Sequence, residues 1–332
     1  MSPTVKKQGY WRLVARQFRK NRLAVDGLFV IMLLFAVALS APFLAHERPY
    51  YLRLDGETYW FPNIIEYKEL HDVDFKTWEP GPDDYVVRPP VSYSPTSQSL
   101  FERLEGPCKK HPLGTDDRGR DVLARMIWGT RISMTIGFVA VGISVLIGVV
   151  IGALGGYYGG KVDMVVQRLI EIMMCFPTFF LVLTLRAVLP PSIYTVMVVI
   201  GITTWTGVAR LVRGEFFKLR ESDFAVAARA TGLSDGRIMF RHLLPNAMAP
   251  VLVNATFGVA GAILLESGLS FLGFGVPPPT ASWGEILKQA KSYVEYAWWL
   301  VVFPGVAIFI TVTAFNLVGE GIRDAMDPRL RE

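Results

Sequence analysis

The chain has 332 residues and a formal net charge of +5, with 52% hydrophobic and only 19% charged residues. Soluble domains are nearer about 25% charged, and here the charges gather between long apolar windows. This distribution excludes an ordinary soluble enzyme, a disordered chain and a disulfide scaffold, and it predicts a protein that crosses a membrane several times.

Six apolar windows are long enough to span a bilayer, since a spanning helix needs ~20 mostly apolar residues. The windows are continuous rather than alternating, which favours helices over barrel strands. They cover residues 23–45, 132–153, 164–189, 193–211, 247–270 and 297–317. We therefore predict an all-α membrane protein with six transmembrane helices.

The positions of the basic residues predict the orientation, because Lys and Arg near the span ends favour the cytoplasm. The leader, residues 1–22, has several basic side chains and no acidic one, and the loop 212–246 is rich in arginine. Both termini, including the tail 318–332, are then expected in the cytoplasm. The basic net charge is therefore a topology signal, and we expect no nucleic-acid partner.

The segment 46–131 is expected in the periplasm, as an insertion followed by the residues that lead into the second span. Within it, residues 46–112 contain more acidic than basic side chains and many aromatic ones. They are too long for a simple loop and too aromatic for a disordered linker. We expect a small packed insertion with short strands at best.

The loop 212–246 has the pattern of two short amphipathic helices. Ser222 or Asp223 can cap the first helix, and Gly232 can end it in the left-handed conformation. A second helix is expected to end near Leu244, before Pro245. Helical spacing puts three side chains of the first helix on one face: Phe224, Ala227 and Ala228. The pair either lies on the membrane surface or docks on a partner, with Phe224 as the anchor.

The same loop resembles the EAA loop of bacterial ABC importer permeases, in which a glutamate precedes two alanines and a glycine follows. Here Val226 replaces the glutamate, and the loop closes on a Leu-Pro pair. Three further segments, residues 111–122, 269–279 and 324–329, are similar to the dipeptide and oligopeptide branch of that family. The resemblance covers about residues 10–46 and 111–332.

The resemblance implies a type I ABC importer permease fold in the inner membrane, with an extracytoplasmic insertion between the first two helices. The implied partners are a homologous second permease, two ABC ATPases, an extracytoplasmic solute-binding protein, membrane lipid and a peptide substrate. The residues implied to couple to the ATPases are Phe224, Val226, Ala227, Ala228, Gly232, Leu244 and Pro245. Residues 55–62 are similar to the long-loop members associated with oligopeptides and microcin C.

Two other functions remain open at this stage. The same permease fold could import a different solute, such as a nickel chelate or an opine. A stand-alone channel or receptor would need no ATPase, but it leaves the EAA-like loop unexplained.

No catalytic residue, metal site or cofactor is expected in this chain. Residues 155–161 fit the G-x-x-x-x-G-K pattern of a phosphate-binding loop, but Val162 replaces the magnesium-binding hydroxyl and a predicted membrane span precedes it. We interpret these residues as a glycine turn between two spans. ATP is then expected to bind to the partner subunits.

Polar residues near the spans suggest the translocation path and the outer contacts. Glu171, Pro177 and Asn254 are candidates for the path, Pro177 as a hinge; Glu171 could instead only pair with Arg168. The candidates for contact with the binding protein are Arg118, Arg120 and Glu266. The alternative for the charged residues 116–121 is a solvated amphipathic helix at the membrane interface.

Overall fold

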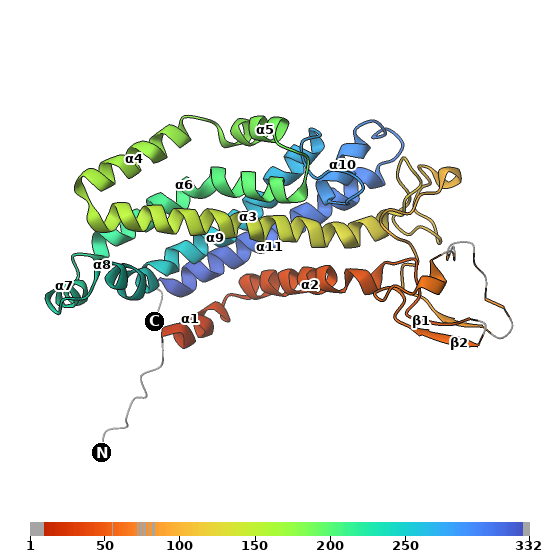
Figure 1. The fold of residues 1–332 in the computed structure, drawn as a ribbon, viewed down its shortest axis with the longest axis horizontal. Helices are drawn as coiled ribbons and strands as arrows, with labels where there is room; N and C mark the ends of the chain where they lie inside the picture. Colours follow the sequence, from red (N-terminus) through yellow and green to blue (C-terminus); the bar gives the residue numbers. More distant parts are fainter. Residues whose placement is uncertain are drawn as a thin grey trace, which may run out of the picture.

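The computed structural model describes residues 10–54, 56–71, 73, 75, 78, 80–81 and 84–327. The first nine residues of the leader, residue 55 of the insertion motif and residues 328–332, which include the last two residues of the C-terminal motif, lie outside the described residues. The helices run side by side in an elongated bundle (Figure 1). We call the end with residues 45–121 the insertion end, and the end with residues 220–243 the loop end.

The described residues contain five helices long and apolar enough to cross a membrane, and a sixth crossing if one bent helix pair forms a single span. The five are α2 (Arg22–Leu44), α3 (Val122–Tyr158), α6 (Ile193–Leu219), the stretch Asp235–Phe271 that ends with α9 (Leu244–Phe271), and α11 (Trp299–Met326). The predicted fold class, a helical membrane protein, is confirmed, with six spans when the bent pair is counted as one.

The third predicted span is broken at its proline. The helices α4 (Gly160–Met174) and α5 (Thr178–Val188) meet at an angle of 78°. Pro177 stands immediately before α5, where its fixed φ suits a helix start and its missing N–H costs nothing. The break therefore follows from the proline, and the expected interruption of the span 164–189 at Pro177 is confirmed as a bend between two helices.

Several helices are longer than the apolar windows that predicted them. The helix α3 begins at Val122, ten residues before the window, because the side chain of Asp121 caps it by accepting a hydrogen bond from the amide of Ala124 at 2.7 Å. The helices α6 and α11 likewise run on past residues 211 and 317. A short helix, α1 (Tyr10–Phe18), lies within the leader.

Glycines spaced four residues apart allow α3 to pack tightly on α6. A Cβ at Gly148 or Gly156 would lie 2.6 Å from a side-chain carbon on α6, and one at Gly152 would overlap the carbonyl oxygen of Ala209. Small residues at this spacing let membrane helices approach closely. The close contact between α3 and α6 therefore depends on these three glycines, which have no side chain to hold the helices apart.

Residues 155–161, which fit the pattern of a phosphate-binding loop, form the end of α3, the turn that follows it and the start of α4. Gly155 and Gly156 belong to α3, and Gly159 and Gly160 turn the chain into α4 with φ of 66° and 52°. This confirms the predicted glycine turn between spans.

The insertion contains a small antiparallel sheet of three strands in the order β2-β1-β3. The strands are β1 (Tyr51–Leu54), β2 (Glu57–Trp60) and β3 (Tyr85–Val87). Short 3-10 helices cover Lys68–Leu70 and Leu100–Glu102. A separate apolar cluster forms beneath the sheet around Leu52, Tyr59, Leu70 and Phe75. The predicted packed insertion with short strands is confirmed.

Candidate coupling loop and translocation cavity

The loop end presents a short helix, α7 (Asp223–Ala230), followed by a turn at Gly232. The backbone carbonyl of Ser222 accepts hydrogen bonds from the amides of Ala225 and Val226, which begins the helix. Gly232 has φ of 77°, a conformation that favours glycine, so it ends the helix as predicted.

The two faces of α7 have different surroundings. Ala225 and Ala228 are buried and pack on a core that includes Val212 and Phe216 of α6. Phe224, by contrast, is 43% exposed. The predicted shared face of Phe224, Ala227 and Ala228 is therefore wrong for Ala228, because α7 lies across the bundle end and turns that side inward. The side chains open to a partner belong to Phe224, Val226 and Ala227, with Gly232 beside them.

The second predicted helix does not end before the span. It begins as the single turn α8 (Asp235–Arg237), continues through a π-helical turn, Ile238–Leu243, and becomes α9. Leu244 is half-buried and Pro245 is exposed, and both lie in the first turn of α9. Proline has no amide to donate to the preceding turn, and at Pro245 that turn is the π-helical one. The loop and the span are thus one continuous helical element, Asp235–Phe271.

Hydrogen bonds tie the coupling loop to α3. The hydroxyl of Tyr157 donates to Oδ1 of Asp235 at 2.7 Å. Nη1 of Arg220 donates to the carbonyl oxygens of Gly156 at 3.3 Å and Tyr157 at 3.4 Å. The guanidinium of Arg229 in turn donates to the carbonyl of Arg220. These bonds connect α7 and the residues on either side of it to the last turn of α3.

A cavity of about 410 Å³ lies among α3, α5, α6 and α9. Polar side chains from all four helices line it: Ser144, Thr178, Thr204 and Asn254. Asn254 was predicted for the path, and Thr178 follows the predicted hinge residue Pro177 directly. The structure thus places one of the three candidates, Asn254, on the cavity, together with the residue that follows Pro177.

Glu171 does not line this cavity. Its carboxylate accepts hydrogen bonds from Nη1 of Arg168 at 3.2 Å and from Nε2 of Gln167 at 3.0 Å. The Glu171 side chain is 47% exposed. The predicted Arg168–Glu171 pair is confirmed, and a role for Glu171 in the path stays a prediction.

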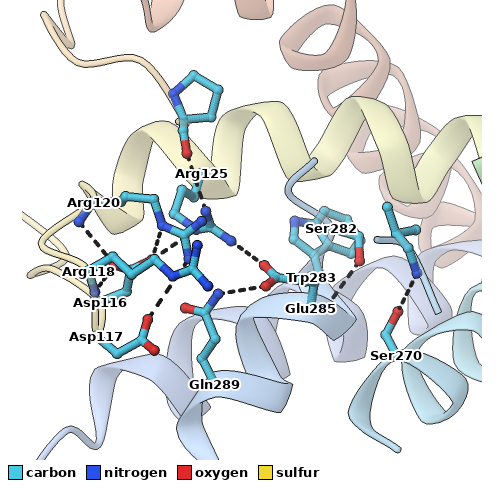
Figure 2. Close-up of polar contacts among 12 residues, drawn as sticks. Asp116, Asp117, Arg118, Arg120, Arg125, Ser270, Ser282, Trp283, Glu285 and Gln289 are labelled. Carbon is cyan, nitrogen blue, oxygen red and sulfur yellow. Dashed lines mark hydrogen bonds and ion pairs between the residues drawn. The ribbon is translucent and has the colours of Figure 1, made fainter. Parts of the chain in front are cut away.

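A buried ion network joins α3 to the insertion end (Figure 2). The carboxylate of Asp116 accepts from the amide of Arg118 at 2.9 Å and from Nε of Arg120 at 2.7 Å. Nε of Arg125 lies 3.4 Å from Asp116 Oδ2, and its Nη2 pairs with Glu285 of α10 (Trp283–Ala290). Asp116, Arg120 and Arg125 are at most 2% exposed.

This network corrects two expectations about the charged residues 116–121. They form no solvated helix, and Arg120 is buried, so its expected contact with a binding protein is wrong. Its guanidinium instead holds the turn that leads into α3. Arg118 is exposed, and its contact with a partner stays a prediction.

Glu266 is also buried, with no exposed surface. Its Oε1 accepts from the hydroxyls of Ser270 at 2.6 Å and Ser282 at 2.9 Å. Ser282 also caps α10 by accepting from the amide of Glu285 at 3.1 Å. Glu266 therefore fixes α10 to α9, and the expectation that it meets the binding protein is wrong.

Two carboxyl groups near the start of α3 have shifted pKa values. Burial raises the pKa of the Asp121 carboxyl above its ordinary value, despite the hydrogen bonds that it accepts. The hydrogen bond from Lys110 lowers the pKa of Glu102, and the ammonium charge adds to the effect. Both carboxyl groups lie beside His111, which Asp121 contacts at 2.8 Å.

Residues 144–332, more than half of the chain, match the family described as binding-protein-dependent transport system inner membrane component. The chain belongs to this family. Residues 9–61 also match the N-terminal TM domain of oligopeptide transport permease C. The protein is thus a permease subunit, a multi-pass inner-membrane protein that works with other ABC transporter components.

Several curated permeases resemble the chain over nearly its whole length. The dipeptide transport system permease protein DppC of Alkalihalophilus pseudofirmus is 35% identical, over 97% of this chain and 90% of that protein. The oligopeptide transport system permease protein OppC of Bacillus subtilis is 33% identical, over 98% and 92%. The peptidoglycan transport system permease protein YejE of Agrobacterium fabrum is 34% identical, over 99% and 94%.

A solved structure supports the fold. An inward-facing structure of the MetNI methionine ABC transporter aligns with 62% of this permease and 98% of the matched chain, with a TM-score of 0.52 and 20% identity. At this identity the likeness shows the fold alone. The ABC importer permease fold expected from the resemblance is confirmed.

Proposed function

We propose that this permease imports peptides, together with a homologous second permease, two ABC ATPases and an extracytoplasmic solute-binding protein. The observation that carries the proposal is the geometry of α7, which exposes Phe224 and Val226 to a partner while Ala225 and Ala228 anchor it to the core. The names of the curated relatives, which are dipeptide, oligopeptide and peptidoglycan permeases, support the peptide cargo.

In this proposal the loop end faces the cytoplasm and the insertion end faces the periplasm. The arginine-rich leader and loop support that orientation. ATP binds to the partner ATPases and not to this chain, and their closure displaces α7. The hydrogen bonds from Tyr157 to Asp235 and from Arg220 to α3 pass this displacement to the spans.

The cavity lined by Asn254 is the part of the path that this chain contributes, and alternating access opens it to one side at a time. Its volume of about 410 Å³ and its hydroxyl and amide groups suit a polar solute. The largely unburied span α2, with exposed side chains such as Met32 and Leu39, is available to lipid or to the second permease. Arg118 remains the candidate for contact with the binding protein.

The test is purification of the chain from its native membrane in mild detergent, followed by identification of the co-purifying proteins. We expect a second permease and ABC ATPases, and peptide-stimulated ATP hydrolysis by the complex after reconstitution with its binding protein. Recovery of the chain alone in several detergents would favour the channel or receptor and overturn the proposal.

The matched variants are Gly232→Glu and Gly160→Glu. Both glycines have positive φ, and at both no atom lies within 4 Å of the position that a Cβ would take, so both substitutions strain the backbone similarly. Only Gly232 lies beside α7. We expect Gly232→Glu to abolish peptide-stimulated hydrolysis while Gly160→Glu retains most of it. Normal transport by the Gly232→Glu complex would refute the coupling assignment.

A further inference from the structure

Three possible metal ligands meet at the insertion end, although the sequence shows no metal-binding spacing. Glu102 ends a short 3-10 helix, Glu105 follows it, and His111 lies in the loop before α3. One ligand atom from each lies within 4.8 Å of the other two. The group lies outside the coupling loop and the cavity, so it is independent of the proposed function.

The imidazole of His111 is fixed in place as metal-binding histidines are. Its side chain is 1% exposed, and Nδ1 lies 2.8 Å from Oδ2 of Asp121. The other oxygen of Asp121 caps α3, and the ring of Tyr93 packs on the imidazole with centroids 4.8 Å apart. A carboxylate that holds one ring nitrogen of a histidine orients the other toward a metal ion.

The second nitrogen of His111 has no hydrogen-bond partner among the described residues. This Nε2 faces Oε2 of Glu102 at 3.7 Å, which is beyond hydrogen-bond range. In the tautomer that donates from Nδ1 to Asp121, Nε2 presents a lone pair to an anionic carboxylate. A buried lone pair beside an anion is unfavourable, and either a metal cation between the two atoms or a proton on Nε2 relieves it.

The dimensions suit a small divalent ion. Zinc binds imidazole nitrogen and carboxylate oxygen at about 2.0–2.2 Å, so one ion can contact two atoms that are 3.7 Å apart. Lys110 pairs with the other oxygen of Glu102 and leaves Oε2 available. Cys108 is free, and its Sγ lies 4.0 Å from Oε1 of Glu105, next to the group.

We propose that His111, Glu102 and Glu105 bind a divalent first-row transition-metal ion of the zinc type. A nitrogen ligand with two carboxylates favours such an ion over calcium or magnesium, which prefer oxygen ligands alone. The bound ion joins the 3-10 helix at residue 102 to the start of α3, and it stabilises the turn that carries the buried ion network.

The test is equilibrium dialysis of the purified full-length chain in detergent against Zn²⁺, with metal measured by mass spectrometry. We expect one Zn²⁺ per chain and a rise in unfolding temperature on adding Zn²⁺, because a ligand that binds only the folded state stabilises it. Excess Ca²⁺ should not displace it. Replacement of Zn²⁺ by Ca²⁺ would indicate a plain acidic cluster and overturn the proposal.

Three variants locate the ion. Glu105 is exposed, so Glu105→Gln should fold normally and weaken Zn²⁺ binding at least about tenfold. Asp121→Asn should weaken it by about 10–100-fold, the usual effect of losing a partner that orients a ligand. Glu69→Gln, an exposed glutamate elsewhere in the insertion, is the matched control and should bind as the parent.

Cys108→Ser separates the proposed ligands from the neighbouring thiol. We expect it to retain one Zn²⁺ per chain. Absence of stoichiometric Zn²⁺ in the parent chain, or equal binding by Glu105→Gln and the parent, would overturn the proposal and leave His111 as an ion-pair partner of the two acidic residues.

Discussion

The buried ion network gives the most quantitative prediction for this permease. Arg125 is fully buried, and its guanidinium contacts Asp116, Glu285 and the carbonyl oxygen of Pro95 at 3.2 Å. In Arg125→Met, Asp116 keeps its ion pair with Arg120, but Glu285 keeps only neutral hydrogen-bond partners. Removing one member of a buried ion pair lowers the free energy of unfolding by about 3–5 kcal/mol, because the other charge stays buried without a partner.

The measurement is denaturant unfolding of the purified chain in detergent, followed by tryptophan fluorescence. The control is Arg131→Met, an exposed arginine on the same helix, which should change stability by no more than about 0.5 kcal/mol. In the double variant Arg125→Met/Glu285→Gln, the Glu285 charge is removed together with its partner. This variant should therefore be more stable than Arg125→Met alone. A cost below about 1 kcal/mol for Arg125→Met, or additive costs in the double variant, would refute this reasoning.

Three further predictions concern packing, the cavity and coupling. Gly152→Leu should prevent stable folding of the purified chain, because a side chain there overlaps the carbonyl of Ala209. Gly261→Leu should fold, since no atom lies within 4 Å of a Cβ at this position. Its side chain would fill the cavity, so it should reduce peptide uptake into proteoliposomes. The control is Gly305→Leu on α11, where the position of a Cβ is equally open. Phe224→Ala should leave the unfolding free energy within about 0.5 kcal/mol, because its side chain is 43% exposed, while it reduces ATPase co-purification. Unchanged uptake by Gly261→Leu, or full ATPase recovery with Phe224→Ala, would contradict the respective assignment.

Local patterns were enough to predict the spans, the packed insertion and the end of α7 at Gly232. Each of these depends on residues close in sequence: a run of apolar side chains, a group of aromatic ones, or one glycine with positive φ. The break at Pro177 was foreseen as a hinge, but its angle depends on what α4 and α5 pack against. Helix ends were underestimated because helices continue beyond the apolar windows.

The site features that sequence reasoning missed depend on how the chain packs, and some of them join residues that are distant in sequence. Arg125 and Glu285 are 160 positions apart, so nothing near either residue indicates the pair. Arg120 and Glu266 look like surface charges in sequence, and only the packing of the folded chain around them shows that they are buried. The inward turn of Ala228 likewise depends on α6. No spacing rule joins Glu102, Glu105 and His111.

These contacts give α3 a specific place in the proposed transport cycle. The helix has 37 residues, so it is about 55 Å long at ~1.5 Å per residue. Its first turns are fixed by Arg125 in the buried network, and its last turn meets the coupling loop through Tyr157. Between them, glycines lock it against α6. Because it is held at both ends and packed along its length, α3 and α6 should move as one body. An ATPase that displaces α7 would then reorient the cavity wall at Ser144 and Thr204 as a unit, without bending either helix.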